Sequence, residues 1–158
     1  FYENVLKDCA ETIYFKDWNN YYNVHVAKSA PPPVFELKEL WVNYQKQHEF
    51  NPSHRHNGCV FSFVVFMKIP TDFRKEHELS FIKDSNNRLA SSFSFYYMDT
   101  LGRLNPHYYH LDKEAEGRML FFPAALKHTV YPFYTSTKDR ITVAGNISLD
   151  SDQPLDTK

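Results

Sequence analysis

Short apolar runs with a period of two, separated by turn residues, constrain the fold of this chain more than any other feature. Residues 61–67 are apolar at every position except Ser62, which is typical of a central strand buried on both faces. Shorter runs with the same period occur elsewhere in the chain, at residues 40–44, 79–81, 93–97, 119–122 and 141–147. Gly, Pro and Asn residues separate these runs. We therefore predict an all-β core of seven or eight strands, arranged as a sandwich or jelly roll.

The composition indicates a globular domain with an aromatic interior. The chain has 158 residues, of which 42% are apolar and 17% are aromatic, and the aromatic share favours strands. The net charge of −1 argues against a partner that is nucleic acid or a membrane surface. The apolar run at residues 60–67 is too short to span a bilayer. Cys9 and Cys59 cannot form a disulfide framework, so we expect reduced thiols and a cytoplasmic location.

Three consecutive prolines, Pro31 to Pro33, suggest how the chain is divided, because they fit neither a sheet nor a helix interior. Before them, residues 2–14 favour a short helix, since apolar side chains recur there every four residues. We predict an N-terminal cover segment at residues 1–33, the β domain at residues 34–150 and a disordered tail at residues 151–158.

A polar stretch from Leu101 to Glu116 interrupts the strand pattern and is predicted to be a long loop. Loops carried on a rigid scaffold often determine what a protein binds. We therefore expect this stretch and the cover segment to recognise the substrate.

Three histidines form the strongest candidate for a binding site. His54 and His56 lie two residues apart just before the apolar strand, so both can project from one side of an extended segment. His128 follows a later predicted strand and can reach the same place from the opposite sheet. Neutral imidazoles are good ligands for Fe(II), Zn, Ni or Cu. A surface position is the simpler explanation for each of the remaining histidines, which are His25, His48, His77, His107 and His110.

Arg140 and Thr142 form a second candidate site. They lie two residues apart in the last predicted strand and therefore share one face. A buried arginine offers a planar fork for a carboxylate, and a threonine adds a hydroxyl to the same oxygens. An ordinary surface ion pair of Arg140 with Asp139 or Asp150 explains the spacing equally well.

These motifs resemble a known group of proteins. The chain resembles the 2-oxoglutarate- and Fe(II)-dependent oxygenase superfamily, and within it a set of small proteins from bacteria and their viruses. The resemblance covers residues 34–149, and each motif is short, but their order and spacing together are specific. It is carried by Leu40-Trp41-Val42-Asn43-Tyr44, the segment 51–57 with its HxH, Phe66-Met67-Lys68-Ile69-Pro70, the segment 117–123, the segment 126–132, Asp139-Arg140-Ile141-Thr142-Val143 and Asn146-Ile147.

The resemblance implies a fold and a set of roles. The fold is a double-stranded β-helix, which is a jelly roll with the metal between its sheets. The short helix predicted above for the N-terminal segment would precede this β domain. By position, His54 and His128 match the family's metal-binding histidines, and His56 stands where the family has Asp or Glu. Arg140 and Thr142 match the clamp on the C5 carboxylate of 2-oxoglutarate, and Tyr44 stands where an early strand adds a further contact. The implied cofactors are Fe(II) and 2-oxoglutarate, and the implied reaction is hydroxylation with release of succinate and CO2.

The metal has an alternative to Fe(II). His56 leaves more positive charge on the metal than a carboxylate would, so another divalent metal could take its place.

Two other functions remain alternatives to the oxygenase. The first is a cupin-like metal protein, because cupins also use HxH, but Cys59 and Val60 stand where a cupin has a glutamate ligand. A non-catalytic jelly roll with a binding or structural role is the second alternative. The prime substrate, either a small molecule or a peptidyl group, and the oligomeric state remain open.

Overall fold

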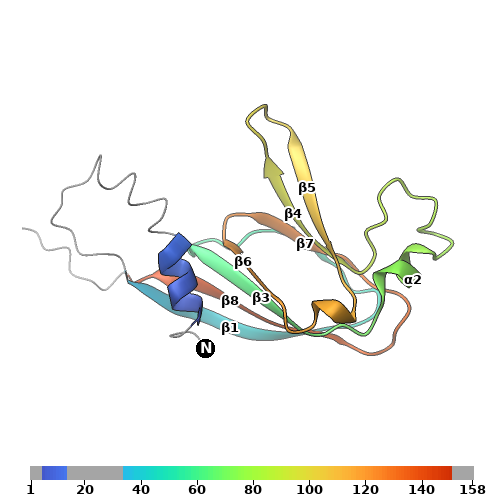
Figure 1. The fold of residues 1–158 in the computed structure, drawn as a ribbon, viewed down its shortest axis with the longest axis horizontal. Coiled ribbons are helices and arrows are strands. Elements are labelled where there is room, and N and C mark those ends of the chain that lie inside the picture. Colours follow the sequence, from blue (N-terminus) through green and yellow to red (C-terminus); the bar gives the residue numbers. More distant parts are fainter. Residues whose placement is uncertain (1–4, 14–33, 151–158) are drawn as a thin grey trace, which may run out of the picture.

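The protein folds into two four-stranded antiparallel sheets packed against each other (Figure 1). The computed structural model describes residues 5–13 and 34–150. The eight strands in chain order are β1 (Phe35–Gln45), β2 (Asn51–His54), β3 (Phe61–Lys68), β4 (Ser92–Met98), β5 (Leu104–His110), β6 (Met119–Pro123), β7 (Lys127–Val130) and β8 (Arg140–Leu149). A short helix, α2 (Phe73–His77), and a 3-10 turn, η2 (Lys113–Ala115), lie in the connections.

The order of the strands is that of a jelly roll. The first sheet has the order β1-β8-β3-β6 and the second has the order β2-β7-β4-β5. Except for the hairpin of β4 and β5, strands that are neighbours in a sheet are distant in the chain. The predicted fold class, an all-β double-stranded β-helix with a short helical N-terminal segment, is confirmed.

Strand β3 is buried on both faces, as the sequence predicts. Its inward side chains Val64 and Phe66 pack between the sheets with residues of β4, β6 and β8. Its outward side chains Phe61 and Phe63 pack under the helical residues 5–13, where Leu6 is also buried. The helix predicted for residues 2–14 is therefore confirmed for the residues that the structure describes, and it covers one end of the first sheet (Figure 1).

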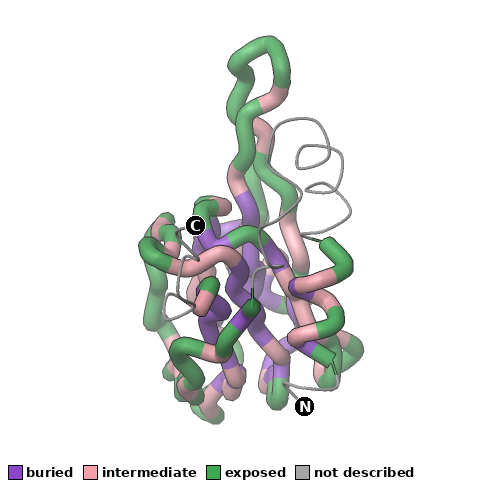
Figure 2. The backbone as a smooth tube through the Cα atoms, turned by 90° about the vertical axis from the view of Figure 1, so that its left-hand side faces the viewer, coloured by how far each residue is buried: buried purple, intermediate pink, exposed green. Residues whose placement is uncertain are grey.

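The prediction of a long loop from Leu101 to Glu116 is wrong. Its central part, Leu104–His110, is strand β5, which pairs with β4 from Ser92↔His110 to Met98↔Leu104. The two strands form a hairpin that projects from the body of the protein, and its outer part is exposed (Figure 2). The hairpin turn is closed by Asp99, whose Oδ1 accepts hydrogen bonds from the backbone N–H groups of Leu101 and Arg103. The sequence of this stretch is polar because both faces of a projecting hairpin contact water. Its strand therefore lacks the alternation of apolar and polar residues that marks a half-buried sheet.

The prediction of a strand at residues 79–81 is also wrong. These residues form turns after α2, and Phe81 is 65% exposed. The side chain of Asp72 caps α2 by accepting a hydrogen bond from the N–H of Arg74, and the backbone bonds that follow are local, such as Ile82 N–H to Leu79 O. Two alternating apolar residues, Leu79 and Phe81, are too few to specify a strand directly after this capped helix.

Several predictions fall outside the described residues. They are the break at Pro31 to Pro33, most of the cover segment at residues 1–33 and the tail at residues 151–158. The division of the chain into these parts therefore stays a prediction. In residues 5–13 and 34–150, no helix has the length and apolar character needed to cross a membrane.

Candidate metal centre

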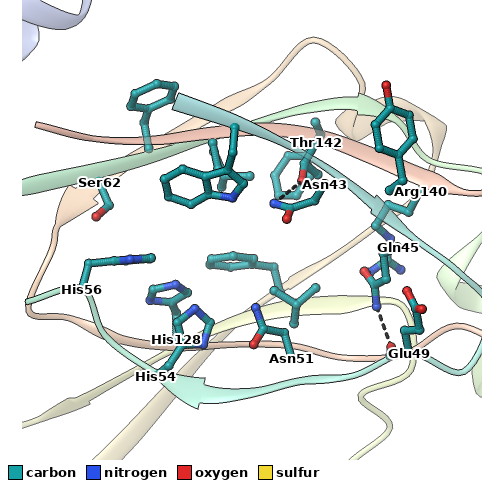
Figure 3. A pocket seen from close by; sticks show the side chains of 18 of the residues that line it. Asn43, Gln45, Glu49, Asn51, His54, His56, Ser62, His128, Arg140 and Thr142 are labelled. Atoms are coloured by element: carbon teal, nitrogen blue, oxygen red, sulfur yellow. Dashed lines mark hydrogen bonds between the residues drawn. The ribbon is translucent and has the colours of Figure 1, made fainter. Parts of the chain in front are cut away.

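The three predicted histidines come together at one sheet (Figure 3). The expectation that His128 reaches the site from the opposite sheet is wrong, because β7 pairs directly with β2. His54 ends β2 and lies directly opposite His128 of β7 in the ladder, and their ring centroids are 4.2 Å apart. His56 follows β2, and its ring lies 5.2 Å from that of His128 and 5.4 Å from that of His54. One ligand atom from each histidine can be chosen such that all lie within 4.8 Å of one another.

Hydrogen bonds leave one ring nitrogen available on two of these histidines. Nδ1 of His54 lies 2.7 Å from the carbonyl of Pro52, and Nδ1 of His128 lies 3.0 Å from the carbonyl of Leu126. A carbonyl oxygen only accepts, so each Nδ1 donates its proton and each Nε2 presents a lone pair. Carbonyl partners of this kind commonly orient metal-binding histidines.

Burial keeps His56 and His128 neutral at pH 7. Desolvation lowers the pKa of the His128 imidazole to about 4, and His128 is only 4% exposed. Burial, followed by the charge of His54, also lowers the pKa of His56, whereas Glu39 opposes that shift. A metal therefore need not displace a proton from either ring, and this donor set fits a divalent transition metal.

Arg140 is buried at the start of β8 and is 1% exposed. Its Nη1 donates to Gln45 Oε1 and to the carbonyl of Tyr131, and its Nη2 donates to Ser91 Oγ. Nε is buried and has no hydrogen-bond partner. The guanidinium also lies over the ring of Phe133, 4.9 Å from its centroid.

No carboxylate forms a direct ion pair with this guanidinium in the part of the chain that the structure describes, and the buried Glu76 acts on it only through its charge. The ion pairs there involve other residues, so the alternative of a surface ion pair with Asp139 or Asp150 does not hold for Arg140. Burial lowers the pKa of Arg140 to about 10, although Glu76 opposes the shift, so the side chain remains charged at pH 7. A buried cation without an anionic partner is costly, and an anion bound beside it would remove that cost.

One cavity of about 550 Å³ connects the histidines with Arg140. Figure 3 shows His54, His56 and His128 at one end and Arg140 with Gln45 at the other. Thr142 lines the wall between them, and its Oγ1 accepts a hydrogen bond from Asn43 Nδ2.

The structure places Tyr44 differently from its neighbours on β1. Tyr44 contributes to the cavity lining but is 61% exposed, and strand alternation puts it on the opposite face from Asn43 and Gln45. Gln45, which pairs with Arg140 across the sheet, makes the hydrogen bond to the guanidinium. Asn43, Gln45 and Ser91 were not predicted to belong to the site. Asn43 and Gln45 could have been found from the sequence, because neighbours of Tyr44 in a strand face the side opposite to it.

A family model described as "Putative 2OG-Fe(II) oxygenase" matches residues 39–146 of the sequence. The chain belongs to this family. The match contains the three histidines together with Arg140 and Thr142, so the resemblance inferred from the motifs is confirmed. A search of the curated proteins finds no match for this family member.

Solved structures similar to this 2OG-Fe(II) oxygenase family member include jelly rolls. An oxidoreductase of the 2OG-Fe(II) oxygenase family from Burkholderia pseudomallei has a TM-score of 0.51 and 13% identity, over 82% of this chain. The similar region is 50% of that protein, so this chain spans about half of its length. An RmlC-like cupin protein from Desulfovibrio desulfuricans has a TM-score of 0.32 and 16% identity, over 78% of this chain and 93% of that chain. At 13% identity, the first similarity supports the fold alone.

Proposed function

We propose that this protein is a 2-oxoglutarate- and Fe(II)-dependent dioxygenase that hydroxylates a small-molecule or peptidyl substrate. The observation that carries the proposal is the pairing, in one cavity, of a three-histidine cluster with a buried arginine that forms no ion pair with a carboxylate in the described part of the chain. A molecule that chelates a metal at one end and carries a carboxylate at the other matches both ends. 2-Oxoglutarate has this chemistry, and the family to which the chain belongs is named for it.

Separate residues of the cavity would bind the metal and the co-substrate. His54, His56 and His128 would hold the metal. Arg140 would bind the distal carboxylate of 2-oxoglutarate, and the hydroxyl of Thr142 would donate to the same group. When bound, iron and 2-oxoglutarate supply the oxygen chemistry, in which the co-substrate loses CO2 to give succinate and the substrate gains a hydroxyl group.

The walls of the cavity would exclude water and fix the orientation of the co-substrate. Phe66, Phe93 and Phe122 line the cavity and are buried. Low polarity around Arg140 strengthens its attraction for a carboxylate. The exposed residues Glu49 and Phe50 also line the cavity.

An anaerobic titration tests this proposal. Metal-free protein is titrated with Fe(II) and then with 2-oxoglutarate while the visible charge-transfer absorption is recorded. We expect a band only when both are present. We expect His128→Ala to lose metal binding, and Arg140→Ala to keep the metal but to require much more 2-oxoglutarate. Arg88→Ala is the matched control, because Arg88 is exposed and forms only a surface ion pair with Glu78.

The other outcomes point to other functions. Bound metal without the band would favour a cupin-like metal protein. If neither metal nor 2-oxoglutarate binds, a non-catalytic jelly roll becomes the better explanation.

A further inference from the structure

His56 differs from the other two histidines in what holds its Nδ1 atom. Nδ1 of His54 and Nδ1 of His128 each face a backbone carbonyl. Nδ1 of His56 instead faces Nδ2 of the Asn146 side chain at 3.5 Å, which is too long for a strong hydrogen bond. A fixed backbone carbonyl therefore orients two of the rings, and a side chain stands beside the third.

Asn146 is in turn held by a carboxylate. It is 2% exposed, its Nδ2 donates to Glu39 Oε2 at 2.5 Å, and its Oδ1 accepts from Ser62 Oγ at 2.7 Å. A carboxylate only accepts, so Glu39 fixes which end of the amide faces His56. Glu39, Asn146 and Ser62 thus form a polar chain that ends at the histidine which stands in the place of the family's carboxylate.

The backbone turns Glu39 toward the cavity side of β1, where its side chain remains exposed to solvent. A register shift between Leu37 and Glu39 interrupts the pairing of β1 with β8, and bulges of this kind redirect side chains. After the shift, Glu39 shares a face with Trp41, which lines the cavity and lies beside His56 with ring centroids 5.8 Å apart. Gly145 permits this arrangement, because a Cβ there would lie 2.5 Å from the Glu39 carbonyl oxygen.

We propose that Glu39, one side chain away from His56, supplies from outside the ligand set the negative charge that a histidine in the carboxylate place removes. This inference rests on the proposed metal site. Three imidazoles contribute no charge to offset a divalent cation, so a carboxylate one side chain away lowers the energy of the loaded state.

Titration with Co(II) tests the role of Glu39 without requiring turnover, because the visible spectrum of Co(II) reports both binding and geometry. We expect Glu39→Gln to weaken Co(II) binding roughly 10- to 100-fold, the range found when outer partners of metal ligands are removed. Glu36→Gln is the matched control. Glu36 lies on the same strand and also accepts a hydrogen bond from β8, from Ser148, but it does not contact Asn146 or a histidine in the described part of the chain.

A double variant tests the direction of the effect. In Glu39→Gln with Asn146→Asp, the amide and the carboxylate exchange places, and the carboxylate then faces Nδ1 of His56 directly. We expect this exchange to restore Co(II) affinity to at least the wild-type level. A role of Glu39 in folding alone would not be rescued by moving its charge.

Each outcome either supports or overturns the inference. Equal Co(II) affinity in wild type and Glu39→Gln overturns it and leaves the proposed function intact. An equal loss in Glu36→Gln, or no recovery in the exchange variant, also overturns it. A wild-type protein that binds no Co(II) overturns the proposed metal site and this inference together.

Discussion

Acidification of the metal-free protein should destabilise it through His128. In the folded protein the pKa of His128 is about 4, against an ordinary value of 6.5, because the ring is buried. Between these values the unfolded chain binds a proton that the folded protein does not, so stability falls as the pH drops below 6.5. This is the direction expected for a base whose folded pKa is lowered.

The shift in the pKa of His128 sets the size of this loss in the free energy of unfolding. One pKa unit corresponds to about 1.4 kcal/mol, and most of the shift is expressed by about pH 4.5. His128 should therefore lower the free energy of unfolding by about 2.5 kcal/mol between about pH 7 and about pH 4.5. His128 is almost fully buried, so screening by solvent does not reduce the figure much.

Urea unfolding of wild type and His128→Gln at both pH values, with a chelator present, measures this contribution. His56, His77 and His110 also have lowered pKa values and add to the total loss in both proteins. We expect the loss in His128→Gln to be smaller than in wild type by about 2.5 kcal/mol. His107→Gln, at an exposed position of β5, should behave as wild type. An equal loss in wild type and His128→Gln would refute the reasoning.

Three further predictions concern the site and its support. Arg140→Lys keeps the charge but loses the planar fork, so 2-oxoglutarate affinity measured by calorimetry should fall roughly tenfold or more while metal affinity is retained; unchanged 2-oxoglutarate affinity would contradict the assignment. His56→Asp adds a negative charge among the ligands and should strengthen Fe(II) binding in an anaerobic titration with turnover retained, whereas weaker binding would show that His56 does not occupy the carboxylate place. Gly145→Ala places a Cβ 2.5 Å from the Glu39 carbonyl oxygen and 2.7 Å from the ring of Phe63, so urea unfolding should show a loss of about 1–3 kcal/mol, and an unchanged midpoint would rule out this close approach.

Strands β1, β3, β4, β6 and β8 and the histidine cluster could be predicted from the sequence because each leaves a local signal. The run at residues 61–67 is apolar on both faces, and β3 is covered on both faces. The spacing of His54 and His56 predicted a shared side, and their rings meet at 5.4 Å.

Other features have no local signal. The hairpin strand β5 meets water on both sides, so its residues carry no buried alternation. The partners of Arg140 are set by the register of β1 with β8, and a shift of one residue exchanges Tyr44 for Gln45 at the inner face. The hydrogen bonds of Asn146 depend on a bulge in β1, which the apolar pattern does not encode.

The pairing of strands that are distant in the chain has a consequence for how this protein reaches its folded state. Arg140 and Gln45 are 95 residues apart in sequence, and Asn146 and Glu39 are 107 residues apart. Closing such long loops costs entropy before any contact repays it, and folds with this high contact order assemble slowly. His54 and His128 become neighbours only when β2 has joined β7. Metal binding therefore requires that β2 and β7 have paired, so the rate at which metal binding appears during refolding would report the formation of this long-range contact.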